Sequence, residues 1–162
     1  YVTSSRLETQ ALYDLKGPRA ALLNWAGKAL PPFPEKPNSK AGAGGMDLMF
    51  IGSDHWILRA DLTTEVALET ALRPAEAPPD VSIVRVSDTM AFFRITGPDA
   101  GEVMAVACPM DLHASRFGPE AVSFTEAFGL KALVTRCEGG FDLAVEQSFG
   151  PMVTDYLSRV IS

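Results

Sequence analysis

Histidine and cysteine, the side chains that most often bind metals or act as nucleophiles, are scarce in this sequence. Its 162 residues include two histidines and two cysteines. Two cysteines form at most one disulfide bridge, and a domain of this length buries roughly 70% of the surface that its unfolded chain exposes, so it needs no such bridge to fold. We therefore expect reduced thiols and a cytoplasmic protein.

The sequence also lacks a basic excess and a long apolar run. Its net charge at pH 7 is -6, whereas proteins that bind nucleic acids or anionic membranes usually present a basic face to the phosphates. No segment approaches the ~20 consecutive apolar residues that span a bilayer. The sequence thus predicts no nucleic-acid partner and no membrane partner. It begins with Tyr1 rather than methionine, which leaves open whether a leader peptide preceded it.

What the sequence does contain is the composition of a folded domain, with 47% apolar and 21% charged residues. Ala11, Tyr13 and Leu15 alternate along residues 9–15, which predicts a strand. Pro18 suits the start of a helix, which the prolines that follow its last turn bring to an end. The apolar residues of this helix recur at helical spacing and are Leu22, Trp25, Ala26, Ala29 and Leu30.

The rest of the first half alternates loops, strands and a helix. Residues 37–45 are rich in glycine and small residues, and we expect a flexible loop there. Strands are predicted at 46–51 and 55–60, joined by a tight turn at 52–54. Asp61, Thr63 or Thr64 suits the N-cap of a second helix, and Val81, Ile83 and Val84 begin a further strand. The helix residues expected to face inward are Val66, Ala67, Ala71 and Leu72 or their neighbours.

The second half repeats a similar order. Ala91–Ile95 predicts a strand, and Gly97-Pro98-Asp99 opens a helix with Asp99 and Glu102 at its positive end. A loop over 108–119 precedes strands near 121–127, 131–137 and 141–146, with Gly139-Gly140 as a hairpin turn. Ser148 suits the cap of a last helix. The residues expected to be buried in the two helices are Val103, Val106 and Ala107, then Phe149, Val153, Tyr156, Leu157 and Val160.

These patterns predict an α+β fold. We expect one domain over residues 1–162, built from two βαβ-type halves at about 9–87 and 88–162, with mixed or antiparallel sheets. The halves match in the order of their elements but not in their residues, which is compatible with a weak internal duplication.

The Cys108–His113 segment offers the one arrangement that could be drawn as a metal site. Cys108, Asp111 and His113 would supply three ligands, and only the remote Cys137 could supply a fourth, whereas zinc commonly takes cysteines in pairs. We favour an irregular turn instead, in which Cys108 and Leu112 belong to the core and Asp111 caps local backbone. The second histidine, His55, lies within a predicted strand.

Other patterns typical of active sites are incomplete. A Cys–His nucleophile pair from Cys108 or Cys137 with His113 needs a third group that orients the histidine, and no Gly-x-Ser-x-Gly elbow occurs. The glycines of 42–45 precede a predicted strand rather than a helix, so a linker is favoured over a phosphate loop. Gly97–Gly101 is interpreted as a helix cap. We therefore expect no catalytic, cofactor-binding or metal-binding residue.

Apolar side chains outside the periodic segments are the remaining candidates for a partner surface. The prolines and Phe33 of residues 31–34 form a stiff loop that no local pattern buries. The methionines are more typical of core residues that fill gaps, and they are Met46, Met49, Met90, Met104, Met110 and Met152.

Several short sequence motifs together resemble the gamma subunit of heterotetrameric sarcosine oxidase, over roughly residues 10–160. The most specific is Cys-Pro-Met-Asp-Leu-His at 108–113, followed by Phe117. Thr-Gly-Pro-Asp-Ala at 96–100 is shared with a wider folate-related superfamily that includes glycine-cleavage aminomethyltransferase. The other words are Leu30-Pro31, Pro37-Asn38, Ile51–Leu58, Val84–Asp88, Phe93–Ile95 and Gln147–Phe149.

This resemblance implies a fold like the folate-binding domain of aminomethyltransferase and a role as a non-catalytic subunit of an oxidoreductase complex. Its partners would be the alpha, beta and delta subunits, which would hold FAD, covalent FMN, NAD, tetrahydrofolate and zinc. The complex would oxidise an N-methyl amine and pass the one-carbon unit to tetrahydrofolate. Gln147 and Met110 depart from residues common in the family, and the substrate stays open among sarcosine, dimethylglycine and related amines.

A stand-alone folate-binding or one-carbon-transfer protein is the alternative. Such a site needs an acid that grips the pterin, and Asp88, Asp99 and Asp111 are the candidates near the shared words. The chain is much shorter than a full aminomethyltransferase, which disfavours this alternative. The iron–sulphur-assembly relatives of the fold are disfavoured because the sequence has no Gly-Cys-Tyr word.

Overall fold

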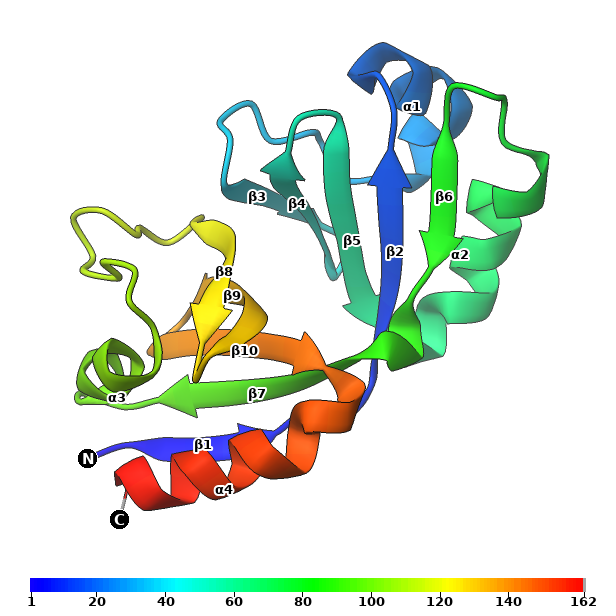
Figure 1. Ribbon diagram of the computed structural model, residues 1–162. Coiled ribbons are helices and arrows are strands. Elements are labelled where there is room, and N and C mark those ends of the chain that lie inside the picture. The colour runs from blue at the N-terminus through cyan, green and yellow to red at the C-terminus, as the bar shows by residue number, and fades with distance from the viewer. Residues whose placement is uncertain (162) are drawn as a thin grey trace. The chain divides into compact units, whose positions relative to one another are not determined.

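The computed structural model describes residues 1–161, which divide into two compact units. Unit 1 comprises residues 1–9 and the chain from Asp88 onward, and unit 2 comprises Gln10–Ser87. Each unit holds one five-stranded sheet in which every pairing is antiparallel, and two α-helices lie against it (Figure 1). The predicted α+β class is confirmed.

Unit 2 has the strand order β3-β4-β5-β2-β6. Its strands are β2 Gln10–Lys16, β3 Ser39–Ala43, β4 Met46–Gly52, β5 His55–Asp61 and β6 Ser82–Arg85. Its helices are α1 Arg19–Ala26 and α2 Glu65–Leu72, with the short 3-10 turns η1 Gly27–Ala29, η2 Leu62–Thr64 and η3 Pro74–Glu76. The turn η4 Ser87–Thr89 follows β6.

The core of unit 2 forms where alternate residues of β2 meet the helices. Ala11, Tyr13 and Leu15 are fully buried and pack with Leu22 of α1 and Leu68 of α2. The predicted strand is confirmed. The predicted helix ends earlier than expected, with Leu22 and Ala26 buried in α1 and Ala29 in the turn that follows it. Burying a large side chain of this kind contributes about 1.5–3 kcal/mol, so these few residues hold both helices on the sheet.

Two predictions for unit 2 are wrong. Ser39–Ala43 is a strand rather than part of a flexible loop, because its backbone pairs with β4 across a turn at Gly44 and Gly45. Both glycines have positive φ, 61° and 79°, which glycine adopts without strain. Phe33, whose exposure the sequence left open, is buried and packs edge-on against Trp56 with ring centroids 5.3 Å apart.

The second error concerns the residues that α2 turns toward the sheet, of which Leu72 is buried as predicted and three others are not. Val66 is 80% exposed, and Ala67 and Ala71 are exposed as well. Leu68 and Leu72 are the buried apolar residues. Short helices with alternating small and large apolar residues admit more than one apolar stripe, and packing against Tyr13 selects the one that contains both leucines.

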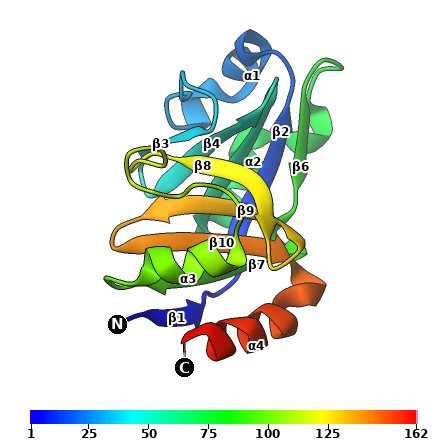
Figure 2. The same ribbon diagram turned by 60° about the vertical axis from the view of Figure 1, so that its left-hand side comes forward.

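Unit 1 has the strand order β1-β7-β10-β9-β8. Its strands are β1 Thr3–Arg6, β7 Met90–Thr96, β8 Val122–Ala127, β9 Leu130–Cys137 and β10 Gly140–Glu146. Its helices are α3 Ala100–Ala107 and α4 Gly150–Ile161, and the turn η5 Gln147–Phe149 precedes α4. In both views α4 runs beside β1 (Figures 1 and 2).

The core of unit 1 is built from alternate residues of β7 and β10 beneath the two helices. Phe93 and Ile95 of β7 pack with Phe141 of β10, Met104 of α3 and Leu157 of α4. The predicted strands and both helices of this half are confirmed, with boundaries shifted by a few residues. β1 was not predicted, because its sequence Thr-Ser-Ser-Arg carries no apolar alternation and its four residues are exposed.

Two helix predictions in unit 1 are wrong in detail. Val106 is 70% exposed, whereas Val103 and Ala107 are buried as predicted, together with Met104. Ser148 does not begin α4, since it lies within η5, where its hydroxyl hydrogen-bonds the Glu146 carboxylate. Phe149 also lies in this turn and is 40% exposed. Within residues 1–161, no helix has the length and apolar character needed to cross a membrane.

Candidate functional site

The Cys108–His113 segment forms the irregular turn that the sequence favours. Cys108 and Leu112 are buried in the core of unit 1, and Asp111 Oδ1 accepts a hydrogen bond of 3.0 Å from the backbone N–H of His113. A carboxylate that closes such a turn satisfies a backbone donor that would otherwise need water. The predicted irregular turn, with Cys108 and Leu112 in the core, is confirmed.

The geometry of Cys108, Asp111 and His113 does not support a metal site. His113 Nδ1 accepts a hydrogen bond of 3.2 Å from the N–H of Ser115 and lies 2.9 Å from its hydroxyl. Cys108 points into the apolar core. Across residues 1–161, no three His, Cys, Asp or Glu side chains are grouped closely enough to hold a metal ion. The surface depression of about 480 Å³ beside this turn includes Glu102, Asp111 and His113 in its wall.

Arg136 holds the loop that follows this turn. Its guanidinium donates hydrogen bonds of 2.7 Å to the carbonyl of Leu112 and 2.8 Å to the carbonyl of Phe117, and it lies 4.3 Å from the ring centroid of Phe141. Cation–π stacking and charge-assisted hydrogen bonds of this kind immobilise a loop without secondary structure. Residues 108–117 therefore include a loop that Arg136 holds in place.

Cys137 of β9 contacts a charged pair that joins β7 to β10. Arg94 makes a bidentate pair with Asp142, with Nε–Oδ1 and Nη2–Oδ2 distances of 2.8 Å and 2.9 Å. Asp142 is 2% exposed. The hydrogen bond with Asp142 is the main cause that raises the pKa of Arg94, and a hydrogen bond with Cys137 adds to it. His113 instead pairs with Ser115, so the structure does not join it to Cys137.

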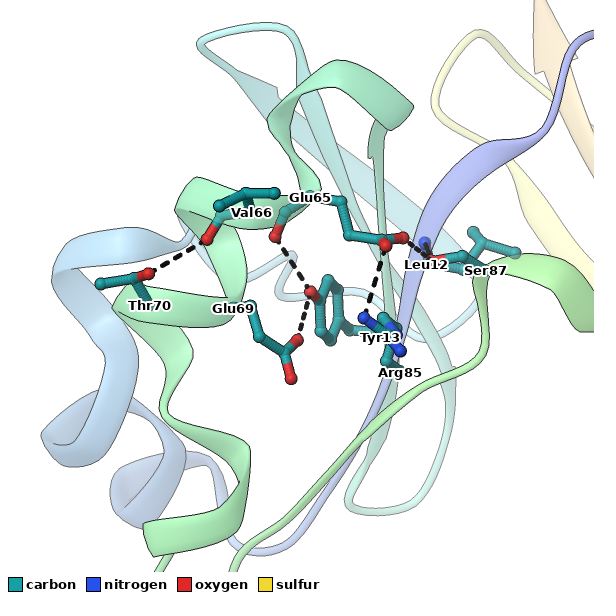
Figure 3. Close-up of polar contacts among 8 residues, drawn as sticks. All are labelled: Leu12, Tyr13, Glu65, Val66, Glu69, Thr70, Arg85 and Ser87. Carbon is teal, nitrogen blue, oxygen red and sulfur yellow. Dashed lines mark hydrogen bonds and ion pairs between the residues drawn. The ribbon is translucent and has the colours of Figure 1, made fainter.

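A second polar cluster fastens α2 to the sheet of unit 2 (Figure 3). The hydroxyl of Tyr13 donates a hydrogen bond of 2.7 Å to Glu69 Oε2. Ser87 Oγ donates one of 2.5 Å to Glu65 Oε2 and accepts one of 3.1 Å from the backbone N–H of Leu12. Arg85 Nη1 lies 3.5 Å from Glu65 Oε1. Each carboxylate of α2 therefore meets a donor from β2, from β6 or from η4.

The electrostatics of this cluster suit anchoring rather than proton transfer. Burial is the largest cause that raises the pKa of Tyr13 above its ordinary value of about 10, and its hydrogen bond to Glu69 raises it further. The phenol is fully buried and remains a neutral donor at physiological pH. A general base must instead have a pKa near the working pH and reach its substrate.

Sequence reasoning missed this cluster, although a signal was present. Glu65 and Glu69 are four residues apart and lie on the same helix face as Leu68 and Leu72, so burial of the leucines brings the carboxylates to the sheet. Tyr13 was expected only as a core residue. Its hydroxyl needs a partner once buried, and that requirement points to a polar side chain on the covering helix.

The remaining candidate patterns are dispersed. Gly42 lies in β3 and the glycines after it form a hairpin turn, so no helix N-terminus follows them. Gly97 precedes α3 with φ 125°. Among the acids considered for a pterin, Asp99 and Asp111 line two different depressions, and Asp88 lies in η4. His55 pairs with Asp14 of the neighbouring strand.

Solved structures with the same fold identify the architecture. The chain superposes on a chain of heterotetrameric sarcosine oxidase from Corynebacterium sp. U-96 in complex with pyrrole 2-carboxylate with a TM-score of 0.81 and 23% identity, covering 98% of this chain and 83% of that one. It matches glycine cleavage system aminomethyltransferase T from Bartonella henselae with a TM-score of 0.71 and 15% identity, covering 96% of this chain and 45% of that one. The expected fold likeness to both proteins is confirmed.

Comparisons at the level of sequence add no relative. No protein-family model matches the chain, and no curated protein matches it. At 23% and 15% identity, the structural likenesses establish the fold and leave the function to be argued from it.

Proposed function

We propose that this chain is a non-catalytic, structural subunit of a flavin-dependent complex that oxidises N-methyl amines, of the heterotetrameric sarcosine oxidase kind. The observation that carries the proposal is the extent of the structural likeness, which covers 98% of this chain and 83% of a sarcosine oxidase chain. A match over nearly the whole of both chains is what a corresponding subunit gives, whereas a shared domain within a larger enzyme covers only part of the longer chain.

The hydrogen bonds that the polar side chains make within the chain support a structural role. Tyr13 and Asp111 hydrogen-bond groups of their own unit, and Arg136 holds loop carbonyls. An active site instead directs such groups into a cavity where a substrate reaches them. The chain would therefore contribute shape and contact surface to the complex.

The chemistry of the complex would reside in its other subunits. The alpha, beta and delta subunits would hold FAD, covalent FMN, NAD, tetrahydrofolate and zinc, in the cytoplasm. A flavin would oxidise the N-methyl amine, and tetrahydrofolate would accept the one-carbon unit. This chain would bind none of these groups with its own side chains alone.

Co-expression with the larger flavoprotein subunits of a sarcosine oxidase-type complex tests the proposal. A tag on this chain should recover one stable assembly that carries the visible absorbance of flavin and oxidises an N-methyl amine. The tagged chain expressed alone should show no flavin absorbance and should aggregate more readily, because a contact surface made for a partner is exposed.

Two results would contradict this proposal. One is a monodisperse chain that ignores the flavoprotein subunits when they are present. The other is turnover of an N-methyl amine by the chain in isolation. Expression of the larger subunits without this chain is the matched control, and it should lower the yield of assembled complex.

A further inference from the structure

Helix α2 turns both of its charged side chains toward the sheet, and the side chains that it turns toward solvent are uncharged. Glu65 and Glu69 point to Tyr13 and Ser87, whereas Val66 and Thr70 point away from them (Figure 3). A surface helix normally has the opposite arrangement, with charged residues on its solvent face. The outer face of α2 therefore has the composition of a contact surface.

The outer face of α2 is apolar along its length. Its positions are Val66, Ala67, Thr70 and Ala71, all exposed, and Val66 is 80% exposed. The hydroxyl of Thr70 donates a hydrogen bond of 3.1 Å to the carbonyl of Val66. This back-bonding turns the one polar group of the face onto the helix itself, so the face offers methyl groups to a neighbour.

A depression of about 650 Å³ continues this face toward α1. Ala71 lines it from α2, and Leu23, which is 45% exposed, lines it from α1. The Trp25 indole N–H donates a hydrogen bond of 2.8 Å to the Leu72 carbonyl and fixes the two helices together at this point. We call the outer face of α2 and this depression the α1–α2 surface.

The charged residues that line the depression are both cationic, Lys28 and Arg73, although the chain as a whole carries a net charge of -6. Arg73 is held in place, since its guanidinium carbon lies 3.9 Å from the ring centroid of Trp25 and Nη2 donates a hydrogen bond of 3.1 Å to the Trp25 carbonyl. Its backbone has φ 47°, a region that favours glycine after a helix. A cation held this way beside an apolar face suits a carboxylate.

We propose that the α1–α2 surface is the docking site for another subunit of the complex, through a protein segment that presents an apolar side chain beside an aspartate or glutamate. The apolar side chain packs on the Val66 and Ala71 methyl groups, and the carboxylate meets Lys28 and Arg73. This inference rests on the proposed function, which supplies the partner subunit. It adds the surface and the chemistry by which the partner is recognised.

Two substitutions test the two halves of the surface in the co-expressed complex. Val66→Lys puts a charge where the partner's apolar side chain packs, and Lys28→Glu reverses the charge offered to its carboxylate. Both residues are exposed, so the fold should tolerate them, which circular dichroism checks. Each substitution should weaken association with the larger subunits about tenfold or more. Lys28→Arg keeps the charge and should assemble normally.

Val106→Lys on α3 is the matched control, because Val106 is a valine on a helix surface with 70% exposure and lies in unit 1. It should leave assembly unchanged. If the unaltered chain assembles and Val66→Lys and Lys28→Glu assemble equally well, this docking surface is overturned while the proposed function stands. An equal loss with Val106→Lys also overturns it. If the unaltered chain itself does not assemble, the proposed function and this inference both fail.

Discussion

Among the residues that the structure describes, Asp142 is the one charged residue that is buried. Its carboxylate is 2% exposed and is held by both nitrogens of the Arg94 fork, while the Arg94 side chain is 45% exposed. Removing one member of a buried ion pair is more costly than never having had the pair, because the remaining charge stays in a low-dielectric site. The position across β7 and β10 makes this pair part of the sheet, since Asp142 lies directly opposite Arg94.

Arg94→Ala should therefore lower the free energy of unfolding by about 2–4 kcal/mol. Urea unfolding followed by circular dichroism measures the change. Arg94→Lys is the matched control: it keeps the charge but not the bidentate fork, and should lose less. Stability of Arg94→Ala within error of the unaltered chain would mean that Asp142 finds an equivalent partner.

Tyr13 predicts how the chain responds to high pH. Its pKa in the folded chain is raised above its ordinary value of about 10, so between these two pKa values the folded state binds a proton that the unfolded state has lost. Stability falls with rising pH wherever the native state binds more protons. The contribution of Tyr13 is fully present below about pH 10 and is lost as the pH rises from there toward the raised pKa.

Comparison with Tyr13→Phe isolates this contribution. Near neutral pH the variant should be less stable by about 1–2 kcal/mol, because Glu69 loses a donor. Above about pH 10 its free energy of unfolding should fall less steeply with pH than that of the unaltered chain. Chemical unfolding at a series of pH values measures both slopes, and equal slopes would show that Tyr13 titrates normally.

At the scale of elements, the β9–β10 hairpin contains two adjacent glycines that are needed for different physical reasons. Gly139 is in the turn with φ 78° and has open space where a Cβ would lie. Gly140 begins β10, and a Cβ there would lie 1.9 Å from the carbonyl oxygen of Ile95. Gly139 is needed for the left-handed backbone conformation of the turn. Gly140 is needed because β10 approaches β7 too closely for a side chain.

Gly140→Ala should therefore be the more damaging of two matched substitutions. We expect a loss of about 3 kcal/mol, because backbone of β7 or β10 must shift to admit the methyl group. Gly139→Ala should cost about 1–2 kcal/mol for placing alanine in the left-handed region. Melting temperatures of both variants test the order, and a reversed order would contradict the packing explanation.

The elements predicted correctly are those whose own periodicity decides their structure. β2 and β10 alternate or run apolar over seven residues each, and such strands are recognisable locally. β1 and β3 lack apolar alternation and become strands through hydrogen bonds to β7 and β4. The Glu65–Ser87 and Arg94–Asp142 contacts join residues 22 and 48 positions apart, so only the folded sheets bring them together.

Across the whole molecule, the two units share one plan. Each sheet has the sequence-consecutive strands at one side, β3-β4-β5 in unit 2 and β8-β9-β10 in unit 1, followed by β2 or β7. The last position is taken by β6 in unit 2 and by β1 in unit 1. β6 follows α2 in the chain, whereas β1 precedes every other element. This repeated order supports an internal duplication in which the edge strand of unit 1 comes from the start of the chain.

A stand-alone folate-binding function is the alternative that the sequence left open, and tetrahydrofolate binding by the whole chain is its sharpest test. The chain spans 45% of the length of aminomethyltransferase T, and Asp99 and Asp111 do not share a depression. A folate site needs an enclosing pocket with convergent polar groups. Titration calorimetry of the purified chain with tetrahydrofolate should therefore show no saturable heat, whereas the proposed function predicts saturable heat for the assembled complex. Saturable heat at micromolar concentration would favour the stand-alone folate-binding function over a purely structural subunit, and Asp99→Asn and Asp111→Asn would then show which depression binds.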